Sequence, residues 1–333
     1  MPPISATPES IAYAYRLFLD REPENSQVID EKLIHLKTSQ DVRREFLHSG
    51  EFKEKNPGVH TLTLSGYEPA ITVEDVTDLR PLFSHIQKVW ENFGETEPYW
   101  SVLASDEFKT HNIAATKQQF YDSGFTSADL LFKTLDRLGI DRSHLKTCLE
   151  YGCGLGRVTG ALAKTFDHVS GYDISRSHLR IAQRHFDETG ITNVSLHHVG
   201  SPQAVENFPK VDVVYSVIVL QHNPPPVIQF IIREFLRALN PGGVAFFQVP
   251  TYRAGYAFSL QDYLTNQATR GEMEMHLLPQ NRIFDIAAQE QGQLVAVVED
   301  NMTGLRPGER SNTFVIQKLT SSSGSKTDGA FRR

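Results

Sequence analysis

The sequence predicts an α/β fold: a Rossmann-like sheet of seven strands with helices on both faces, preceded by a small all-α domain. From about residue 126, apolar runs alternate with amphipathic helical segments. Such βαβα alternation is typical of a parallel sheet that is covered on both faces. Upstream of that point the apolar residues recur at helical spacing, which predicts helices without strands.

Residues 1–58 are expected to form the helical domain. In "PESIAYAYRLFLDREP" four apolar side chains recur at helical spacing: Ile11, Tyr15, Leu17 and Phe18. This helix is expected to stop at Pro23. The next two helices are expected to begin at Ser26 and Ser39, because serine caps helix N-termini well.

Residues 59–125 are expected to be a linker followed by helices that cover a ligand site. Around 56–78 the chain has no helical period and carries Pro and Gly, which indicates a linker or a short hairpin. A helix is expected over 79–94, with Pro81 tolerated in its first turn.

The α/β domain is expected to span residues 126–319. Its strands are predicted near 147–152, 168–173, 194–199, 211–219 and 243–249, followed by "QLVAVVED" and "NTFVIQKL". Its helices are predicted near 127–138, 156–166, 176–189, 225–239 and 281–291. Residues 320–333 are polar and contain glycine, which predicts a disordered tail.

Composition and charge narrow the range of partners. The net charge of −7 and the lack of a dense Lys/Arg run argue against nucleic acid. Cys148 and Cys153 form no CxxC pair or disulfide framework, so a reducing cytoplasm is expected. The first residues lack the pattern of a signal peptide. The longest apolar run, 213–220, is too short to span a membrane.

The stretch "LEYGCGLGRVTG" (149–160) joins a predicted strand to a predicted helix, the context of a nucleotide-binding loop. Glycines let backbone amides approach a ligand closely. A P-loop would need Lys and Ser/Thr after the last glycine, where Arg157 and Val158 stand. The dinucleotide pattern GxGxxG also fails, because its third glycine position is Arg157 and the glycine falls one residue early, at Gly156. The pattern that fits is ExGxGxG.

This pattern resembles motif I of the class I S-adenosylmethionine-dependent methyltransferases. The resemblance continues through "GYDIS" (171–175), "VDVVYSVIVLQHNPP" (211–225) and "LNPGGVAFFQVP" (239–250), and covers roughly residues 126–319. It implies an enzyme that binds S-adenosyl-L-methionine and transfers its methyl group.

The resemblance also implies a set of cofactor-binding residues. Asp173 follows the loop by about 20 residues and is expected to accept hydrogen bonds from the ribose hydroxyls. The glycines would approach the amino-acid part of the cofactor, with Glu150 orienting the loop or the cofactor's ammonium group. "GSP" (200–202) lies where adenine contacts usually fall, and aromatic residues before the fold often close over the cofactor. The full expected set is Glu150, Gly152, Gly154, Gly156, Asp173, Ile174, Ser201, Val217, Trp100 and Tyr121.

Methyl transfer to a hydroxyl needs a base, and two histidines are candidates. His222 follows the fourth strand, at the sheet edge where ligands bind. The alternative is a histidine that packs against the next helix or caps it. His276 lies in a variable region that often covers the acceptor in this family; otherwise it is a surface histidine. Gln221, Tyr252 and Arg253 are expected to line the acceptor cleft. No metal site is expected, because the carboxylates that catechol-type members carry after strand four are absent here.

The N-terminal segment 15–52 resembles a bacterial linker-type helical domain of unknown function. The residues that carry the resemblance are Leu19, Arg21, Pro23, Phe46, Ser49, Glu51 and Phe52, although some usual glycine and tryptophan positions are absent. Such domains often accompany enzymes of surface glycan assembly, so the expected acceptor is a small-molecule or glycan hydroxyl. Two other functions stay open: a non-catalytic scaffold with this fold, and a nicotinamide-dependent oxidoreductase. The sequence gives no indication of the oligomeric state.

Overall fold

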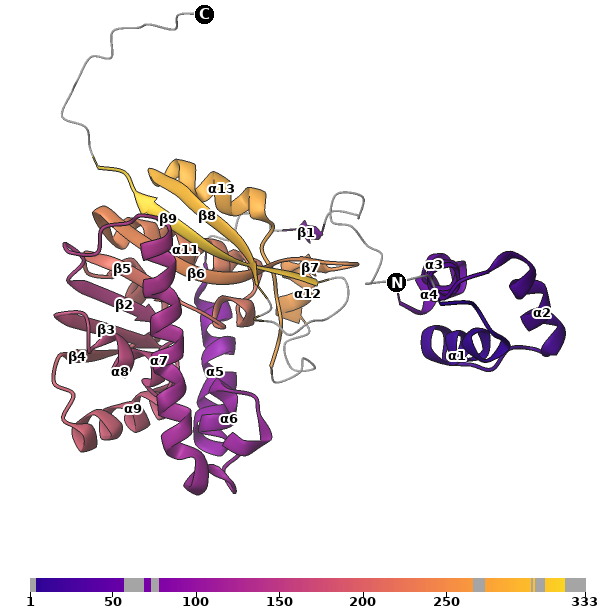
Figure 1. Ribbon diagram of the computed structural model, residues 1–333. Coiled ribbons are helices and arrows are strands. Elements are labelled where there is room, and N and C mark those ends of the chain that lie inside the picture. The colour runs from indigo at the N-terminus through magenta and orange to yellow at the C-terminus, as the bar shows by residue number, and fades with distance from the viewer. Residues whose placement is uncertain are drawn as a thin grey trace, which may run out of the picture. The chain divides into compact units, whose positions relative to one another are not determined.

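In the computed structural model the chain forms two compact units (Figure 1). The first comprises residues 1–68 and 305–309, and the second comprises residues 69–304 and 310–333. The structure describes residues 4–56, 69–72, 78–265, 273–300, 302 and 309–320. The predicted tail therefore lies almost wholly outside the described residues, as does most of the predicted hairpin. No helix in the described part of the chain is long and apolar enough to cross a membrane.

The first unit is a bundle of four helices: α1 (Pro8–Leu19), α2 (Ser26–His35), α3 (Ser39–His48) and α4 (Gly50–Lys55). Its core includes Ile11, Tyr15 and Phe46, whereas Leu17 is 77% exposed. The N-caps of α2 and α3 are Asn25 and Thr38, one residue before the predicted serines. Each of these two side chains accepts a backbone N–H three residues on, which an N-cap must do.

The second unit begins with a short strand and then helices. β1 (Ala70–Thr72) lies in the segment predicted as a linker or hairpin, and it pairs in parallel with β7 (Ala257–Ser259), a strand far away in the sequence. Helices α5 (Arg80–Thr96) and α6 (Pro98–Val102) and a single 3₁₀ turn, η1 (Asp106–Phe108), follow. The helix predicted over 127–138 starts much earlier, because α7 spans Ile113–Arg137.

The sheet has seven strands, which confirms the predicted fold class. They are β2 (Thr147–Tyr151), β3 (His168–Asp173), β4 (Val194–His198), β5 (Val211–Ser216), β6 (Leu239–Arg253), β8 (Gly292–Asp300) and β9 (Glu309–Lys318). Their order is β4-β3-β2-β5-β6-β9-β8. β2 to β6 pair in parallel, whereas β8 and β9 form an antiparallel pair. The parallel pairing expected from the βαβα alternation thus holds for β2 to β6, and the last two strands pair in the opposite sense. Only residues 301–308 separate β8 from β9, fewer than the dozen or so that a crossover between parallel strands needs.

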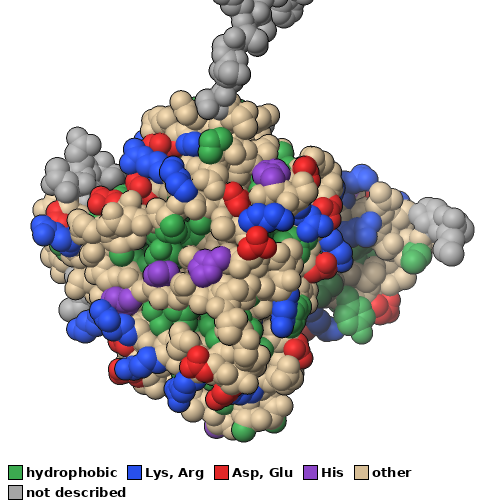
Figure 2. All heavy atoms as spheres, turned by 90° about the vertical axis from the view of Figure 1, so that its left-hand side faces the viewer, with side chains coloured by type: hydrophobic (Ala, Val, Ile, Leu, Met, Phe, Trp, Pro, Cys, Tyr) green, Lys and Arg blue, Asp and Glu red, His purple; other side chains and the backbone are tan. Residues whose placement is uncertain are grey.

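Helices cover both faces of the sheet, because successive strand residues point to opposite sides. Cys148 and Val213 pack with α7 and with α8 (Arg157–Leu162). Their neighbours Leu149 and Val214 pack with α5 and with α11 (Pro225–Ala238) and α13 (Gln280–Gln289). The other helices are α9 (Arg176–Thr189), α10 (Pro202–Glu206), α12 (Leu260–Thr265) and the 3₁₀ turn η2 (Leu220–His222). On the face shown in Figure 2, basic and acidic side chains are interspersed.

Candidate active site

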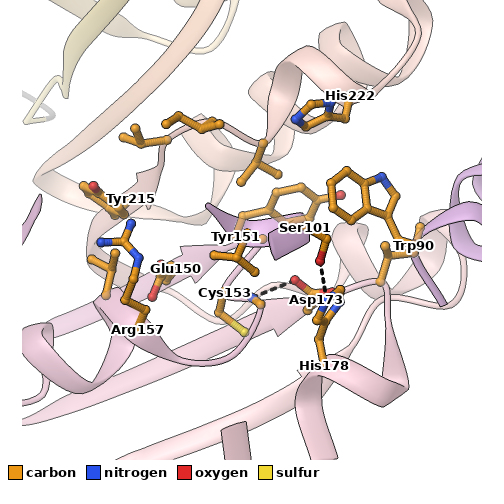
Figure 3. Close-up of a pocket in the computed structure, with 18 of the residues that line it drawn as sticks. Trp90, Ser101, Glu150, Tyr151, Cys153, Arg157, Asp173, His178, Tyr215 and His222 are labelled. Carbon is orange, nitrogen blue, oxygen red and sulfur yellow. Dashed lines mark hydrogen bonds between the residues drawn. The ribbon is translucent and has the colours of Figure 1, made fainter. Parts of the chain in front are cut away.

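A pocket opens at the carboxyl ends of β2, β3 and β5 (Figure 3). In the sheet β2 lies between β3, which follows it in the chain, and β5, so the strand order reverses direction at this point. Such a switch point is where open α/β sheets bind ligands. Helices α5 and α6 supply the wall that faces the strand ends. The lining includes seven predicted residues: Glu150, Gly152, Gly154, Asp173, Ile174, Val217 and His222.

The glycine loop links β2 to α8, and all three glycines have positive φ, which disfavours other residues. A Cβ on Gly152 would meet the Val219 side chain at 2.3 Å, so no larger residue fits there. Gly156, also predicted to approach the cofactor, has a packing role. It does not line the pocket, and a Cβ there would meet the ring of Phe186 at 2.4 Å. Gly156 therefore allows α9 to pack against the loop.

Asp173, the last residue of β3, ties the loop to the neighbouring strand. Its Oδ2 accepts the backbone N–H of Gly154 and its Oδ1 accepts that of Ser175, each at 2.8 Å. The carboxylate is nearly buried and lines the pocket. Each carboxylate oxygen can accept a second hydrogen bond, so Asp173 retains capacity for two hydroxyl donors.

Glu150 and Arg157 lie in another part of the pocket wall. Glu150 accepts the Thr159 hydroxyl at 2.5 Å, and burial raises the pKa of its carboxyl to about 8. Arg157 Nη1 donates to the hydroxyls of Ser123 (3.1 Å) and Ser127 (3.2 Å) on α7. Burial lowers the pKa of the Arg157 guanidinium, but an arginine stays ionised at neutral pH.

His222 has one defined tautomer. Its Nδ1 lies 2.9 Å from the backbone oxygen of Glu274, and because a carbonyl only accepts, Nδ1 carries the hydrogen. The neutral ring therefore presents Nε2 as its acceptor, with the Gln221 amide nitrogen 3.3 Å away. Burial lowers the pKa of His222 to about 4. The ring of Trp90 on α5 lies 5.0 Å from it, centroid to centroid.

His276 does not line this pocket, but both His276 and His222 contact Glu274. Its Nε2 is 2.9 Å from the Glu274 carboxylate and its Nδ1 is 2.9 Å from the Tyr256 hydroxyl. Its backbone N–H donates to the Gln221 carbonyl at 2.6 Å, so Gln221 contacts both histidines. His276 and Arg253 line a second pocket, beside β7 and α12.

The other predicted residues do not line the first pocket. Tyr121 is buried and stacks on His185 (3.5 Å between centroids), and the half-buried Trp100 lies near Phe93 of α5. Ser201 precedes α10 at its N-cap, and Tyr252 is buried near the end of β6.

Sequence reasoning did not find several residues of the pocket. Trp90 and Ser101 come from helices with no motif; the Ser101 hydroxyl lies 2.9 Å from His178 Nε2, which joins α6 to α9. Glu91 accepts the backbone N–H groups of Arg176 (2.7 Å) and Ser177 (3.1 Å) and so fastens α5 to the start of α9.

Ile218, also in the pocket wall, has a φ of +61°. This is a strained conformation for a β-branched residue. Its N–H donates to the Gln248 side chain at 2.9 Å, which helps to hold the turn after β5. Nothing in the sequence indicates this conformation, because Ile218 continues an apolar run that is typical of a strand.

Among the described residues, no group of three or more His, Cys, Asp or Glu side chains is placed to hold a metal ion. Cys148 and Cys153 are both buried and free.

Residues 148–243 match the family model of a methyltransferase domain. The matched stretch runs from β2 into β6 and contains the glycine loop, Asp173 and His222. The match supports the class that the glycine loop predicts, the class I methyltransferases, whose cofactor is S-adenosylmethionine. The match does not include the N-terminal helices, so their resemblance to a linker-type domain stays a prediction.

Two curated relatives are ubiquinone biosynthesis O-methyltransferases. That of Proteus mirabilis (strain HI4320) is 30% identical over 129 residues, which are 38% of this chain and 52% of that protein. That of Pseudomonas fluorescens (strain Pf0-1) is 32% identical over 130 residues, 38% of this chain and 55% of that protein. The chain spans about half the length of these relatives.

Two solved structures are similar to the chain. The [4+2]-cyclase SpnF is 15% identical, with a TM-score of 0.47 over 71% of this chain and 97% of that one. Magnesium protoporphyrin IX methyltransferase (ChlM) from Synechocystis PCC 6803 with bound S-adenosylmethionine is 16% identical. Its TM-score is 0.44, over 74% of this chain and 100% of that one.

Proposed function

We propose that this protein is an S-adenosylmethionine-dependent methyltransferase that methylates a hydroxyl of a small molecule or glycan. One observation carries the proposal: the glycine loop, Asp173 and His222 line the same pocket at the switch point of the sheet. The matched relatives are named O-methyltransferases, which supports a hydroxyl acceptor. The free cysteines are in keeping with a cytoplasmic protein.

The residues present fit this cofactor. Asp173 has acceptor capacity for two ribose hydroxyls beyond its bonds to Gly154 and Ser175. Gly152 and Gly154 leave the loop without side chains on the pocket side, where Val219 and Val102 lie against it. When bound, the cofactor would supply an electrophilic methyl group on a sulfonium.

His222 is the proposed base. Its Nε2 would take the proton from the acceptor hydroxyl as the new O–C bond forms, and the Nδ1–H bond to Glu274 would hold the ring in place. The lowered pKa makes His222 a weak base, but it also keeps the ring neutral, and thus able to accept a proton, at every pH well above 4. Gln221, His276 and Arg253 are proposed to lie along the path of the acceptor, because they connect His222 to the second pocket.

Calorimetric titration with S-adenosylmethionine, S-adenosylhomocysteine and NAD tests the cofactor assignment. We expect the two sulfur compounds to bind and NAD not to bind. A panel of phenols and sugars, screened for release of S-adenosylhomocysteine, then tests the acceptor class. Tight NAD binding would favour an oxidoreductase, and cofactor binding without turnover on any acceptor would favour a scaffold.

A further inference from the structure

A chain of buried side-chain amides runs from the sheet to His222. Gln248 lies in β6 and Gln221 in η2, and both side chains are buried. Gln248 Nε2 lies 3.3 Å from Gln221 Oε1, and Gln221 Nε2 lies 3.3 Å from His222 Nε2. A buried amide is costly unless its polar atoms are hydrogen-bonded, so the contacts of Gln248 define what it can do.

A backbone amide sets the direction of this chain at its first end. The Ile218 N–H can only donate, and its nitrogen lies 2.9 Å from Gln248 Oε1. This contact fixes which way the Gln248 amide faces, since its oxygen must point to Ile218. Gln248 Nε2 then faces two acceptors, Gln221 Oε1 and the Ser311 hydroxyl of β9, which is 2.6 Å away. Both N–H groups of the Gln248 amide are therefore in use.

The chain continues to His222 in the same direction. Gln221 Oε1 accepts from Gln248, so Gln221 Nε2 is the atom that donates to His222 Nε2. At the far end the Glu274 carbonyl can only accept, so the His222 Nδ1 carries the hydrogen. The two ends therefore agree. Four hydrogen bonds run one way, from the Ile218 N–H to the Glu274 carbonyl.

This direction is compatible with the neutral ring of His222 and not with the charged one. A protonated imidazole carries a hydrogen on both nitrogens, so its Nε2–H would face the Gln221 N–H, donor against donor. Gln221 cannot turn its oxygen to Nε2 instead, because its nitrogen would then face the Gln248 nitrogen. Hydrogen bonds to the neutral form of a group disfavour its charged form. The chain therefore acts in the same sense as burial, which lowers the pKa of His222.

The titratable groups around the ring come from three elements. They are His276 and Glu274 in the segment before α13, His85 of α5 beyond Glu274, and His178 of α9 beyond Trp90. Glu274 presents its backbone oxygen to the ring, and the uncharged Trp90 lies beside it (Figure 3). In the part of the chain that the structure describes, Gln221 is the group within hydrogen-bond distance of Nε2.

We propose that Gln248 and Gln221 are positioning residues for the proposed base. Together they hold His222 as the neutral ring with its hydrogen on Nδ1 and its Nε2 lone pair as the acceptor. The inference rests on the proposed function, which assigns His222 as the base. The Gln221 contact of 3.3 Å is longer than the usual value of about 2.9–3.0 Å, so an acceptor hydroxyl can replace the amide at Nε2.

The first test is nitrogen NMR of the full chain labelled with ¹⁵N-histidine, because the shifts of the two ring nitrogens report both tautomer and ionisation. The His222 signals are those that disappear in His222→Ala. We expect the wild-type ring to be neutral, with its hydrogen on Nδ1, from pH 8 down to pH 5, since its pKa is about 4. A ring with its hydrogen on Nε2, or a charged ring at pH 7, would overturn the proposal whatever the variants show.

Gln248→Met removes the amide and keeps a side chain of similar length. Gln221 is then free to turn its oxygen to Nε2, so we expect His222 to be at least half protonated at pH 5. Gln280→Met is the matched control. The Gln280 amide donates to Asn312 Oδ1 at 2.8 Å and is not part of the chain to His222, so this variant should titrate like the wild type. If Gln248→Met also titrates like the wild type, the proposal is wrong.

A double-mutant cycle distinguishes action through Gln221 from a general disturbance of the sheet. In a Gln221→Met background we expect Gln248→Met to change the protonation of His222 no further. A further change as large as in the wild-type background would contradict the proposal. If Gln248→Met does not fold, Gln221→Met alone decides. Its His222 Nε2 signal should move downfield, because that nitrogen loses its donor, and an unchanged signal would refute the role of Gln221.

Titration of S-adenosylhomocysteine into the same samples separates this inference from the proposed function. We expect its affinity to stay within twofold of the wild type in the variants at positions 221, 248 and 280. If the wild type does not bind it, the proposed function fails, whereas the state of the His222 ring is decided by the NMR spectra alone. Lost affinity in Gln248→Met with an unchanged ring would mean that the chain supports the pocket and not the base.

Discussion

The imidazole of His222 donates its Nδ1–H to the backbone carbonyl of Glu274 over 2.9 Å. This bond joins the end of the β5 segment to a stretch more than fifty residues later, and it leaves Nε2 as the ring's acceptor. The candidate base is therefore oriented by a backbone group, which no side-chain substitution at position 274 removes.

His222→Ala is expected to lower kcat on a hydroxyl acceptor by about 10²–10⁴, with little change in cofactor affinity. The acid limb of the wild-type rate profile should lie near pH 4, because the ring accepts a proton only above its lowered pKa. The measurement is kcat against pH for the wild type, for His222→Ala and for His144→Ala, a control at an exposed position. If His222→Ala turns over nearly as fast as the wild type, His222 is not the base, and His276 becomes the candidate.

Asp173→Ala is expected to weaken S-adenosylhomocysteine binding at least tenfold. It would remove the two charge-assisted contacts that we propose to the ribose, each worth roughly 1.5–3 kcal/mol. The variant also leaves the Gly154 and Ser175 amides without their acceptor, so its melting temperature should fall. Asp173→Asn keeps one acceptor oxygen, so its affinity for S-adenosylhomocysteine and its melting temperature should fall less. Normal affinity of Asp173→Ala in calorimetry would contradict the assignment.

Gly154→Val is expected to abolish cofactor binding. Gly154 has a φ of +51°, and a Cβ added to it would meet Val102 Cγ2 at 3.0 Å, so a valine side chain would fill the approach to the loop. Gly190→Val is the matched control, because Gly190 also has positive φ but open space around it. Both variants should lose stability, by on the order of 1–2 kcal/mol. Only Gly154→Val should lose the melting shift that S-adenosylhomocysteine induces in the parent.

Glu150→Gln is expected to change how stability depends on pH. The folded-state pKa of about 8 lies above the ordinary value of 4.5, so the folded protein holds a proton that the unfolded chain has lost. The wild-type free energy of unfolding should therefore decline from pH 4.5 to pH 8, by on the order of a few kcal/mol. Denaturant titrations of Glu150→Gln should lack this decline. The same titrations of Glu95→Gln, at an exposed position, should retain it.

Removal of residues 1–58 is expected to leave a folded protein that still binds the cofactor. All residues that line the pocket belong to the second unit. The check is a melt of the truncated protein with and without S-adenosylhomocysteine. If truncation eliminates the ligand-induced shift, the N-terminal helices complete the site.

The parts of the fold that were predictable from sequence are those with a local signature. Alternating apolar runs predicted the seven strands, and glycines spaced every second residue after Glu150 predicted the loop. The direction of the last two strands was not predicted, because strand direction depends on the connection and not on the strand's own residues. The N-caps of α2 and α3 were missed by one residue, because Asn25 and Thr38 cap as well as the serines beside them.

The pocket wall was less predictable because it is assembled from distant segments. Trp90 lies on a helix more than a hundred residues before His222, whose ring it contacts. The sequence around an aromatic residue on a helix does not indicate which distant residue it will contact. The sequence favoured Trp100 instead, ten residues along. The lowered pKa of His222 was also hidden, because it follows from burial by elements that are remote in the chain.

The attachment of α5 to α9 through Glu91 has a kinetic consequence. Ile86 and Trp90, on the same helix, form one wall of the pocket, so a ligand beneath them departs most readily when α5 lifts away. That movement breaks the bonds of Glu91 to the Arg176 and Ser177 amides. We expect the frequency of this opening to limit repeated turnover only on acceptors whose chemical step is faster than the opening. Good acceptors would then share a common maximal rate.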